Sequence, residues 1–155
     1  MRLTYHADYA LRLLLYLGLK PGEVVTVGEV SDAYGISRNH LIKVAQALGR
    51  LGYVDILRGK MGGLRLARVP EAINIGEVVR QTEPSFDLLE CFDPATNTCP
   101  IISACVLKRI LKDAQTAFLA TLDRYTMADV LKRPETLSSI LQVRRKRNGA
   151  SAVTP

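Results

Sequence analysis

The spacing of hydrophobic residues predicts two helices at the start of the chain. In residues 5–19 apolar side chains recur at the i, i+3, i+4, i+7 spacing of one buried helix face. That face comprises Ala10, Leu13, Leu14 and Leu17. Residues 26–35 begin with Thr26 and Glu29, the residue pair of a capping box, and end at Gly35, which suits a left-handed helix end.

Residues 36–52 follow the second helix almost at once and predict a third. Its apolar stripe comprises Leu41, Val44, Ala45 and Leu48. Its other side is polar and basic, with Arg38, Asn39, Lys43, Gln46 and Arg50. Two helices joined by a few residues, the second with a basic outer face, are the pattern of a helix-turn-helix.

A hairpin is predicted next. Residues 53–58 and 63–68 both alternate apolar and polar positions, and "GKMGG" between them supplies the positive φ that a tight turn requires. A helix-turn-helix followed by a hairpin is a winged helix. The predicted wing is basic, with Arg58, Lys60, Arg65 and Arg68.

The second half of the chain predicts a short helix at residues 74–83 and a long one from about residue 103 to 125. In the long helix, side chains recur in a heptad-like pattern. They are Leu107, Leu111, Ala114, Phe118, Thr121 and Tyr125. A helix of this length on a small domain needs a partner, so we expect a two-fold homodimer; packing against its own domain is the alternative.

The expected fold class is therefore mainly α with a small β-hairpin wing: a winged helix-turn-helix plus a long dimerisation helix. The expected domains are a DNA-binding domain (1–82), a cysteine-rich loop (83–105), the long helix with a short C-terminal helix (103–131), and a basic, disordered tail (132–155).

The distribution of charge along the chain also indicates a class of binding partner. The net charge is +6, but residues 1–70 carry +5, residues 71–100 carry −5 and residues 101–155 carry +6. A basic front half favours a polyanion. No stretch is long and apolar enough for a membrane helix, so we expect a soluble, cytoplasmic protein.

The predicted partner is double-stranded DNA with a palindromic operator. An α-helix fits the major groove, where arginine can pair with guanine and asparagine with adenine. The alternative is an ordinary solvated helix face. The candidate DNA-binding residues are Arg38, Asn39, His40, Lys43, Gln46, Arg50, Arg58, Lys60 and Arg65.

All three cysteines lie in "ECFDPATNTCPIISAC", as Cys91, Cys99 and Cys105. Structural zinc sites usually show close cysteine pairs, which this spacing lacks. A catalytic cysteine needs a base, and His6 and His40 are both placed on or near the DNA-binding helices, so we do not expect an enzyme. Three thiolates suit an iron–sulfur cluster; zinc and redox or structural thiols remain alternatives.

The order of these parts resembles the NsrR/IscR-type family of winged-helix iron–sulfur transcriptional regulators. The likeness covers about residues 1–131 and includes "MRLTYHADYALRLLLYL", "RGKMGGLRLA" and "ECFDPATNTCPIISACVLK", which is most similar to the nitric-oxide-sensing members. Asn39, His40 and Arg58 match positions that relatives use for DNA contacts. Ile42 stands where some members carry a glutamate, which implies a different base preference.

The resemblance also suggests a fourth cluster ligand. Some members carry a histidine three residues after the last cysteine, but this chain has Lys108 there. Some nitric-oxide sensors use an aspartate early in the first helix of the other subunit, and the matching residue is Asp8. His6 or a small molecule is the alternative. A [4Fe-4S] cluster is favoured over [2Fe-2S].

The expected function is therefore a transcriptional repressor that senses nitric oxide and loses operator affinity when its cluster is nitrosylated. One alternative is an iron–sulfur-supply or redox-sensing regulator of the same family. Another is a zinc- or thiol-dependent DNA-binding protein.

Overall fold

The structure is a computed structural model, and it describes residues 2–59 and 61–143 of the 155-residue chain. The helices and strands in this part are α1 (Tyr5–Gly18), α2 (Val27–Tyr34), α3 (Arg38–Arg50), β1 (Val54–Leu57), β2 (Gly63–Leu66), α4 (Ile75–Thr82), α5 (Val106–Leu122), α6 (Met127–Val130) and α7 (Pro134–Ile140). Short 3-10 turns lie at Pro70–Ala72, Glu90–Phe92 and Ile102–Ala104.

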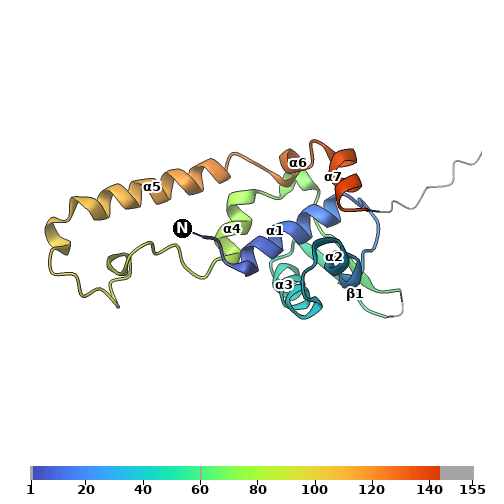
Figure 1. The fold of residues 1–155 in the computed structure, drawn as a ribbon, viewed down its shortest axis with the longest axis horizontal. Helices are drawn as coiled ribbons and strands as arrows, with labels where there is room; N and C mark the ends of the chain where they lie inside the picture. Colours follow the sequence, from blue (N-terminus) through green and yellow to red (C-terminus); the bar gives the residue numbers. More distant parts are fainter. Residues whose placement is uncertain (1, 60, 144–155) are drawn as a thin grey trace, which may run out of the picture.

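Helix α1 lies in the centre of the globular part and packs against α3 and α4 (Figure 1). The predicted apolar face of α1 is fully buried: Ala10, Leu13 and Leu14 are 0% exposed. Thr4 begins the helix, since its hydroxyl accepts the N–H of Ala7 at 3.2 Å. The amphipathic pattern therefore placed the first helix and its core side correctly.

Helices α2 and α3 form the predicted helix-turn-helix. Thr26 and Glu29 make the capping box at the start of α2, and Gly35 closes the helix with a φ of 65°. The conformation of Gly35 is one that residues with a Cβ rarely adopt, which lets α3 begin three residues later. The predicted stripe of α3, from Leu41 to Leu48, is buried against α1.

The wing is a two-stranded antiparallel hairpin, with Val54 opposite Leu66 and Leu57 opposite Gly63. A single bridge between Val25 and Leu64 ties the hairpin to the segment before α2. The mainly helical fold with one hairpin confirms the predicted winged-helix class.

Helix α5 extends away from the globular part (Figure 1). The segment that links α4 to α5 runs out to the far end of α5, and the chain then returns along the helix. The C-terminal end of α5 lies against α4, and its N-terminal end, next to Cys105, is the end remote from the winged helix.

The prediction of a disordered tail from residue 132 is wrong for its first part. Residues Pro134–Ile140 form α7, which begins at a proline, a residue pre-organised for the first helical position. Leu141 and Val143 then pack against the core, so the few apolar residues of this segment suffice to hold it. The rest of the predicted tail lies outside the described residues.

Candidate functional sites

The outer face of α3 carries the predicted DNA-reading side chains. Arg38, Asn39, His40, Lys43, Gln46 and Arg50 are all exposed. They share the helix with a buried stripe, so packing of that stripe against α1 turns the polar side outward. The structure therefore presents these residues together on one solvent-facing surface, which we call the α3 face.

Two neighbours orient residues at the start of α3. The Arg38 guanidinium lies 3.6 Å from the carboxylate of Asp32 on α2, and both side chains are well exposed. The ring of His40 lies beside that of Tyr9 on α1, with centroids 6.2 Å apart. Arg38 and His40 thus each lie beside a residue of a helix that packs on α3, Asp32 of α2 and Tyr9 of α1.

The basic residues of the wing divide into two kinds. Arg58 is exposed, and Arg65 is exposed but paired across the hairpin with Asp55 at 3.0 Å. Arg68 instead donates to the backbone oxygens of Gly52 and Leu51 and covers the Tyr53 ring at 4.5 Å. Arg68 thus anchors the hairpin to the end of α3. Lys60 lies outside the described residues.

The three cysteines are free thiols. Cys91 is buried, and Cys99 and Cys105 are partly exposed. Cys105 caps α5, since its sulfur accepts the N–H of Lys108 at 3.4 Å. The sulfur of Cys105 therefore lies where the loop ends and α5 begins.

The donor set fits an iron–sulfur cluster by its chemistry, because iron in such clusters takes soft thiolate ligands. Among residues 2–59 and 61–143, no three His, Cys, Asp or Glu side chains are arranged to hold a metal ion. Asp8 lies in the first turn of α1 and pairs with Arg12 at 2.8 Å. The described chain thus holds the thiols in one segment but does not bring Asp8 to them.

The apolar side of α5, which includes the predicted seam, is uncovered along much of its length. In the seam, Leu107 is 55% exposed, and Leu111 and Phe118 are half-buried. Beside the seam, Ile110 is 55% exposed, Val106 is 58% exposed and Leu122 is half-buried. Tyr125, at the end of the seam, is 46% exposed. Such a row of exposed apolar side chains is typical of a surface that binds another protein chain.

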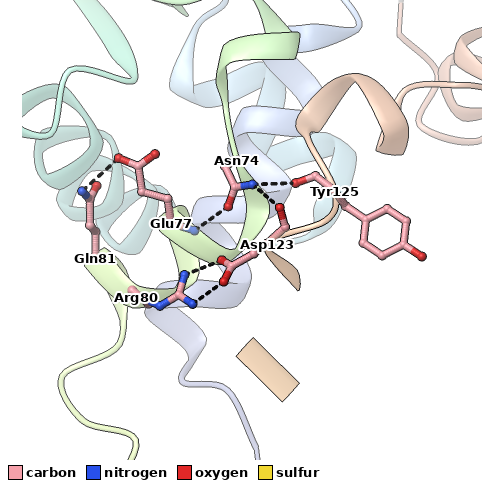
Figure 2. A network of polar contacts seen from close by, with 6 residues as sticks. All are labelled: Asn74, Glu77, Arg80, Gln81, Asp123 and Tyr125. Carbon is pink, nitrogen blue, oxygen red and sulfur yellow. Dashed lines mark hydrogen bonds and ion pairs between the residues drawn. The ribbon is translucent and has the colours of Figure 1, made fainter. Parts of the chain in front are cut away.

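A polar network that the sequence analysis missed connects α4 to the end of α5 (Figure 2). Arg80 donates from both terminal nitrogens to Asp123, at 2.5 and 2.6 Å. The side-chain amide of Asn74 donates to the backbone oxygens of Asp123 and Tyr125, at 2.7 and 3.3 Å. The hydrogen bonds and charge of Arg80 hold the pKa of Asp123 below its usual value.

No local signal in the sequence points to this network, because Arg80 and Asp123 are 43 positions apart. The one residue with a recognisable local role is Asn74. Its side-chain oxygen caps α4 by accepting the N–H of Glu77 at 2.9 Å, and its amide nitrogen reaches α5 (Figure 2).

A winged helix with an exposed basic α3 face defines the class of DNA-binding transcriptional regulators. Residues 3–133 match the Rrf2 family, described as an iron-dependent transcriptional regulator. The chain belongs to the Rrf2 family, which confirms the expected kinship with NsrR/IscR-type regulators. No helix among residues 2–59 and 61–143 is long and apolar enough to cross a membrane.

Curated relatives share nearly half of their residues with this chain. It is 47% identical over 145 residues to the HTH-type transcriptional regulator NsrR of Bacillus subtilis (strain 168), covering 93% of this chain and 99% of the relative. It is 49% identical over 143 residues to the NsrR of Shouchella clausii, covering 92% and 96%. Both relatives are named as regulators of transcription.

Solved structures support the fold. IscR of T. potens superposes with a TM-score of 0.66 at 24% identity, covering 85% of this chain and 87% of that one. CymR of B. subtilis, a global cysteine regulator, superposes with a TM-score of 0.66 at 22% identity, covering 84% and 95%. At these identities the likeness establishes the winged-helix architecture.

Proposed function

We propose that this protein is a homodimeric transcriptional repressor that senses nitric oxide through an iron–sulfur cluster bound at Cys91, Cys99 and Cys105. One observation carries the proposal: every thiol of the chain is free and lies in the single segment that joins the winged helix to α5. The iron dependence of the Rrf2 family and the NsrR relatives support it.

The DNA-binding half of the proposal rests on the α3 face. Arg38 and Asn39 stand in the first turn of α3, the part of a recognition helix that reaches base edges. Lys43 and Arg50 lie one and three turns further along, where they suit phosphates, and Arg58 and Arg65 extend the basic surface onto the wing. His40 and Gln46 complete the proposed interface.

The cofactor half rests on the thiols. When bound, the cluster supplies iron that reacts with nitric oxide; [4Fe-4S] is the proposed type. Cys105 contributes a sulfur at the N-terminus of α5, and Cys91 contributes one that is shielded from solvent. Asp8 of the partner subunit is the proposed fourth ligand, a hard oxygen donor and therefore the weakest of the four.

The homodimer rests on α5. Its exposed apolar row faces no other element among the described residues over its first turns, and a second copy of the same helix would bury it. A two-fold dimer presents two α3 faces, which requires a palindromic operator with two half-sites.

The link between the two halves passes through α1. Asp8 precedes Tyr9, and the Tyr9 ring packs against His40 on α3. When Asp8 is released from its proposed ligand role, it is free to pair with Arg12 as in this structure. A small shift of α1 then reaches the recognition helix through the packing between the two helices, which includes the Tyr9–His40 contact.

The test is an anaerobic purification followed by iron and sulfide analysis, a visible spectrum and a DNA-binding assay. We expect about stoichiometric iron and sulfide, absorbance near 400 nm as is common for iron–sulfur proteins, and loss of operator affinity on adding nitric oxide. Cys91→Ala should lose the iron and the response together.

A preparation without iron or sulfide, with DNA binding unaltered in Cys91→Ala, would overturn the proposal. Parallel exposure to oxygen separates the alternatives: a supply or redox regulator responds to oxygen or to cluster loss, whereas a nitric-oxide sensor responds to nitric oxide first. Zinc in place of iron would identify the zinc-dependent alternative.

A further inference from the structure

The end of α5 is joined to the winged helix at one closely fitted place. We call this place the α4–α5 joint; it comprises Asn74, Arg80, Asp123 and Tyr125, which Figure 2 shows, together with Gly76. On one side, α4 is anchored in the core by Val78 and Val79, both 0% exposed, and packs on α1. A segment that is bonded to α4 therefore keeps its position relative to the DNA-binding half.

The joint holds the direction of α5 as well as its position. Arg80 grips both oxygens of Asp123, and such a two-point contact between planar groups restricts rotation as well as distance. The backbone oxygen of Tyr125 accepts the N–H of Ile75 at 3.0 Å, and the N–H of Met127 donates to Ile73 at 2.8 Å. Both backbone contacts involve residues that follow Asp123, so these contacts and the Arg80–Asp123 pair hold the end of α5 at separate points.

Gly76 shows how close the approach is. A Cβ at this position would lie 2.0 Å from a carboxylate oxygen of Asp123 and 2.9 Å from its backbone nitrogen. Any other residue would push the end of α5 off α4. The pair itself is 41% exposed on both sides, so solvent screens it and its contribution to overall stability is small.

Because α5 is long, a small change of its angle at the joint produces a large displacement at its other end. The helix has 17 residues. At about 1.5 Å per residue it is about 25 Å long, so a turn of about 10° at the joint displaces the far end by about 4 Å. Cys105 stands at that far end, and the exposed apolar row lies between. Cys105, the exposed apolar row and the joint thus lie along one helix.

We propose that the α4–α5 joint sets the angle between α5 and the winged helix, and thereby the spacing of the two half-sites that the dimer accepts. Arg80 and Asp123 are positioning residues for operator spacing and touch neither DNA nor the cluster. This inference rests on the proposed function, because it needs a dimer formed through α5 that binds a two-part operator.

The probe is a palindromic duplex enriched by the wild-type protein from a random-sequence pool, together with versions that have one or two base pairs inserted or removed at the centre, and a single half-site. The variants are Asp123→Asn, which keeps size but removes charge, and Arg80→Lys, which keeps charge but removes the two-point grip. Asp113→Asn, an exposed acid on the same helix, is the matched control.

For both variants we expect affinity for the enriched operator to fall about tenfold, with affinity for the altered spacings unchanged or higher, so that discrimination by spacing is lost. Affinity for the single half-site and the iron content should stay within twofold of the wild type. Asp113→Asn should reproduce the wild-type spacing profile.

A wild-type spacing profile in Asp123→Asn and Arg80→Lys would overturn the inference. So would an equal loss of affinity for the half-site and the full operator, because that result places the defect in the DNA-reading half itself. The enrichment experiment with the wild-type protein comes first. If the wild-type protein enriches no duplex, the proposed function is wrong, and the variants are then not compared.

Discussion

The ammonium group of Lys20 lies 2.9 Å from the carboxylate of Glu29, and the Lys20 side chain is only 6% exposed. This pair joins the segment after α1 to the first turn of α2. Burial opposes the charge on Lys20, but the hydrogen bond and charge of Glu29 outweigh it, so the pKa of Lys20 lies above its usual value.

Replacing Glu29 with Gln should lower the free energy of unfolding by about 1 kcal/mol at neutral pH, because Lys20 loses its nearest counter-charge; the figure is modest since Glu29 is 39% exposed and partly screened. Burial works against the Glu29 carboxylate, but hydrogen bonds from Thr26 and Lys20 hold its pKa below the usual 4.5.

A carboxylate with a lowered pKa stabilises the fold above its unfolded pKa and loses that contribution as the pH falls through the folded pKa. The difference between wild type and Glu29→Gln should therefore be present at pH 7 and shrink below about pH 4.5. Urea unfolding at both pH values measures it. Glu23→Gln, whose carboxylate is 3.6 Å from Lys20, is the control and should show a smaller effect.

Gly76→Ala should destabilise the protein by about 1–3 kcal/mol, because the added methyl group meets the backbone and side chain of Asp123. Gly28 is the matched control: it is also the second residue of a helix, and a Cβ there would have its nearest neighbour at 3.4 Å, the flexible end of Arg38. Gly28→Ala should be neutral or mildly stabilising. Equal melting temperatures for the two variants would contradict this prediction.

Arg38 and Asp32 should have opposite effects on DNA affinity. Arg38→Ala removes a candidate base contact from the start of α3 and should cost about 1–3 kcal/mol of specific binding. Asp32→Asn removes the carboxylate 3.6 Å from Arg38 and one negative charge beside the DNA, so binding should tighten. Fluorescence anisotropy with the enriched duplex at fixed salt measures both; tighter binding by Arg38→Ala would refute the assignment.

Lys43→Ala should weaken binding to all sequences alike. If Lys43 contacts a phosphate, its removal should reduce the log–log slope of affinity against salt by about 0.9. Lys132→Ala, a change of the same charge on an exposed side chain after α6, should leave the slope unchanged.

Leu107→Asp and Ile110→Asp should each convert the dimer to a monomer, since both side chains lie in the exposed apolar row of α5. Sedimentation velocity measures the change. Thr116 lies on the side of α5 away from Leu107 and Ile110 and is exposed, so Thr116→Glu should remain dimeric. Monomeric wild-type protein at micromolar concentration would contradict the proposed dimer.

Asp8→Asn tests the fourth ligand without disturbing the fold. The Asp8–Arg12 pair is exposed, at 36% and 43%, so its loss should change the free energy of unfolding of the apo protein by less than about 1 kcal/mol. The visible spectrum and the rate of reaction with nitric oxide should change. An unaltered spectrum would assign the fourth position to another group.

Local patterns along the chain determined most of the winged helix. The apolar stripes of α1 and α3, the capping box of Thr26 and Glu29, and the glycine turn of the hairpin all depend on residues a few positions apart, and the structure has each element within a few residues of its predicted bounds. The clustering of thiols and the basic face of α3 are visible in the same way.

The tertiary structure decided what depends on distant residues. It made Arg68, one of the basic residues of the predicted wing, an anchor of the hairpin. It also formed a helix after residue 132, where Leu141 and Val143 pack against the core. It also brought Arg80 to Asp123 across 43 positions. The periodicity of apolar residues indicates which side of a helix or strand is buried. Only tertiary packing determines which distant side chain lies against that side.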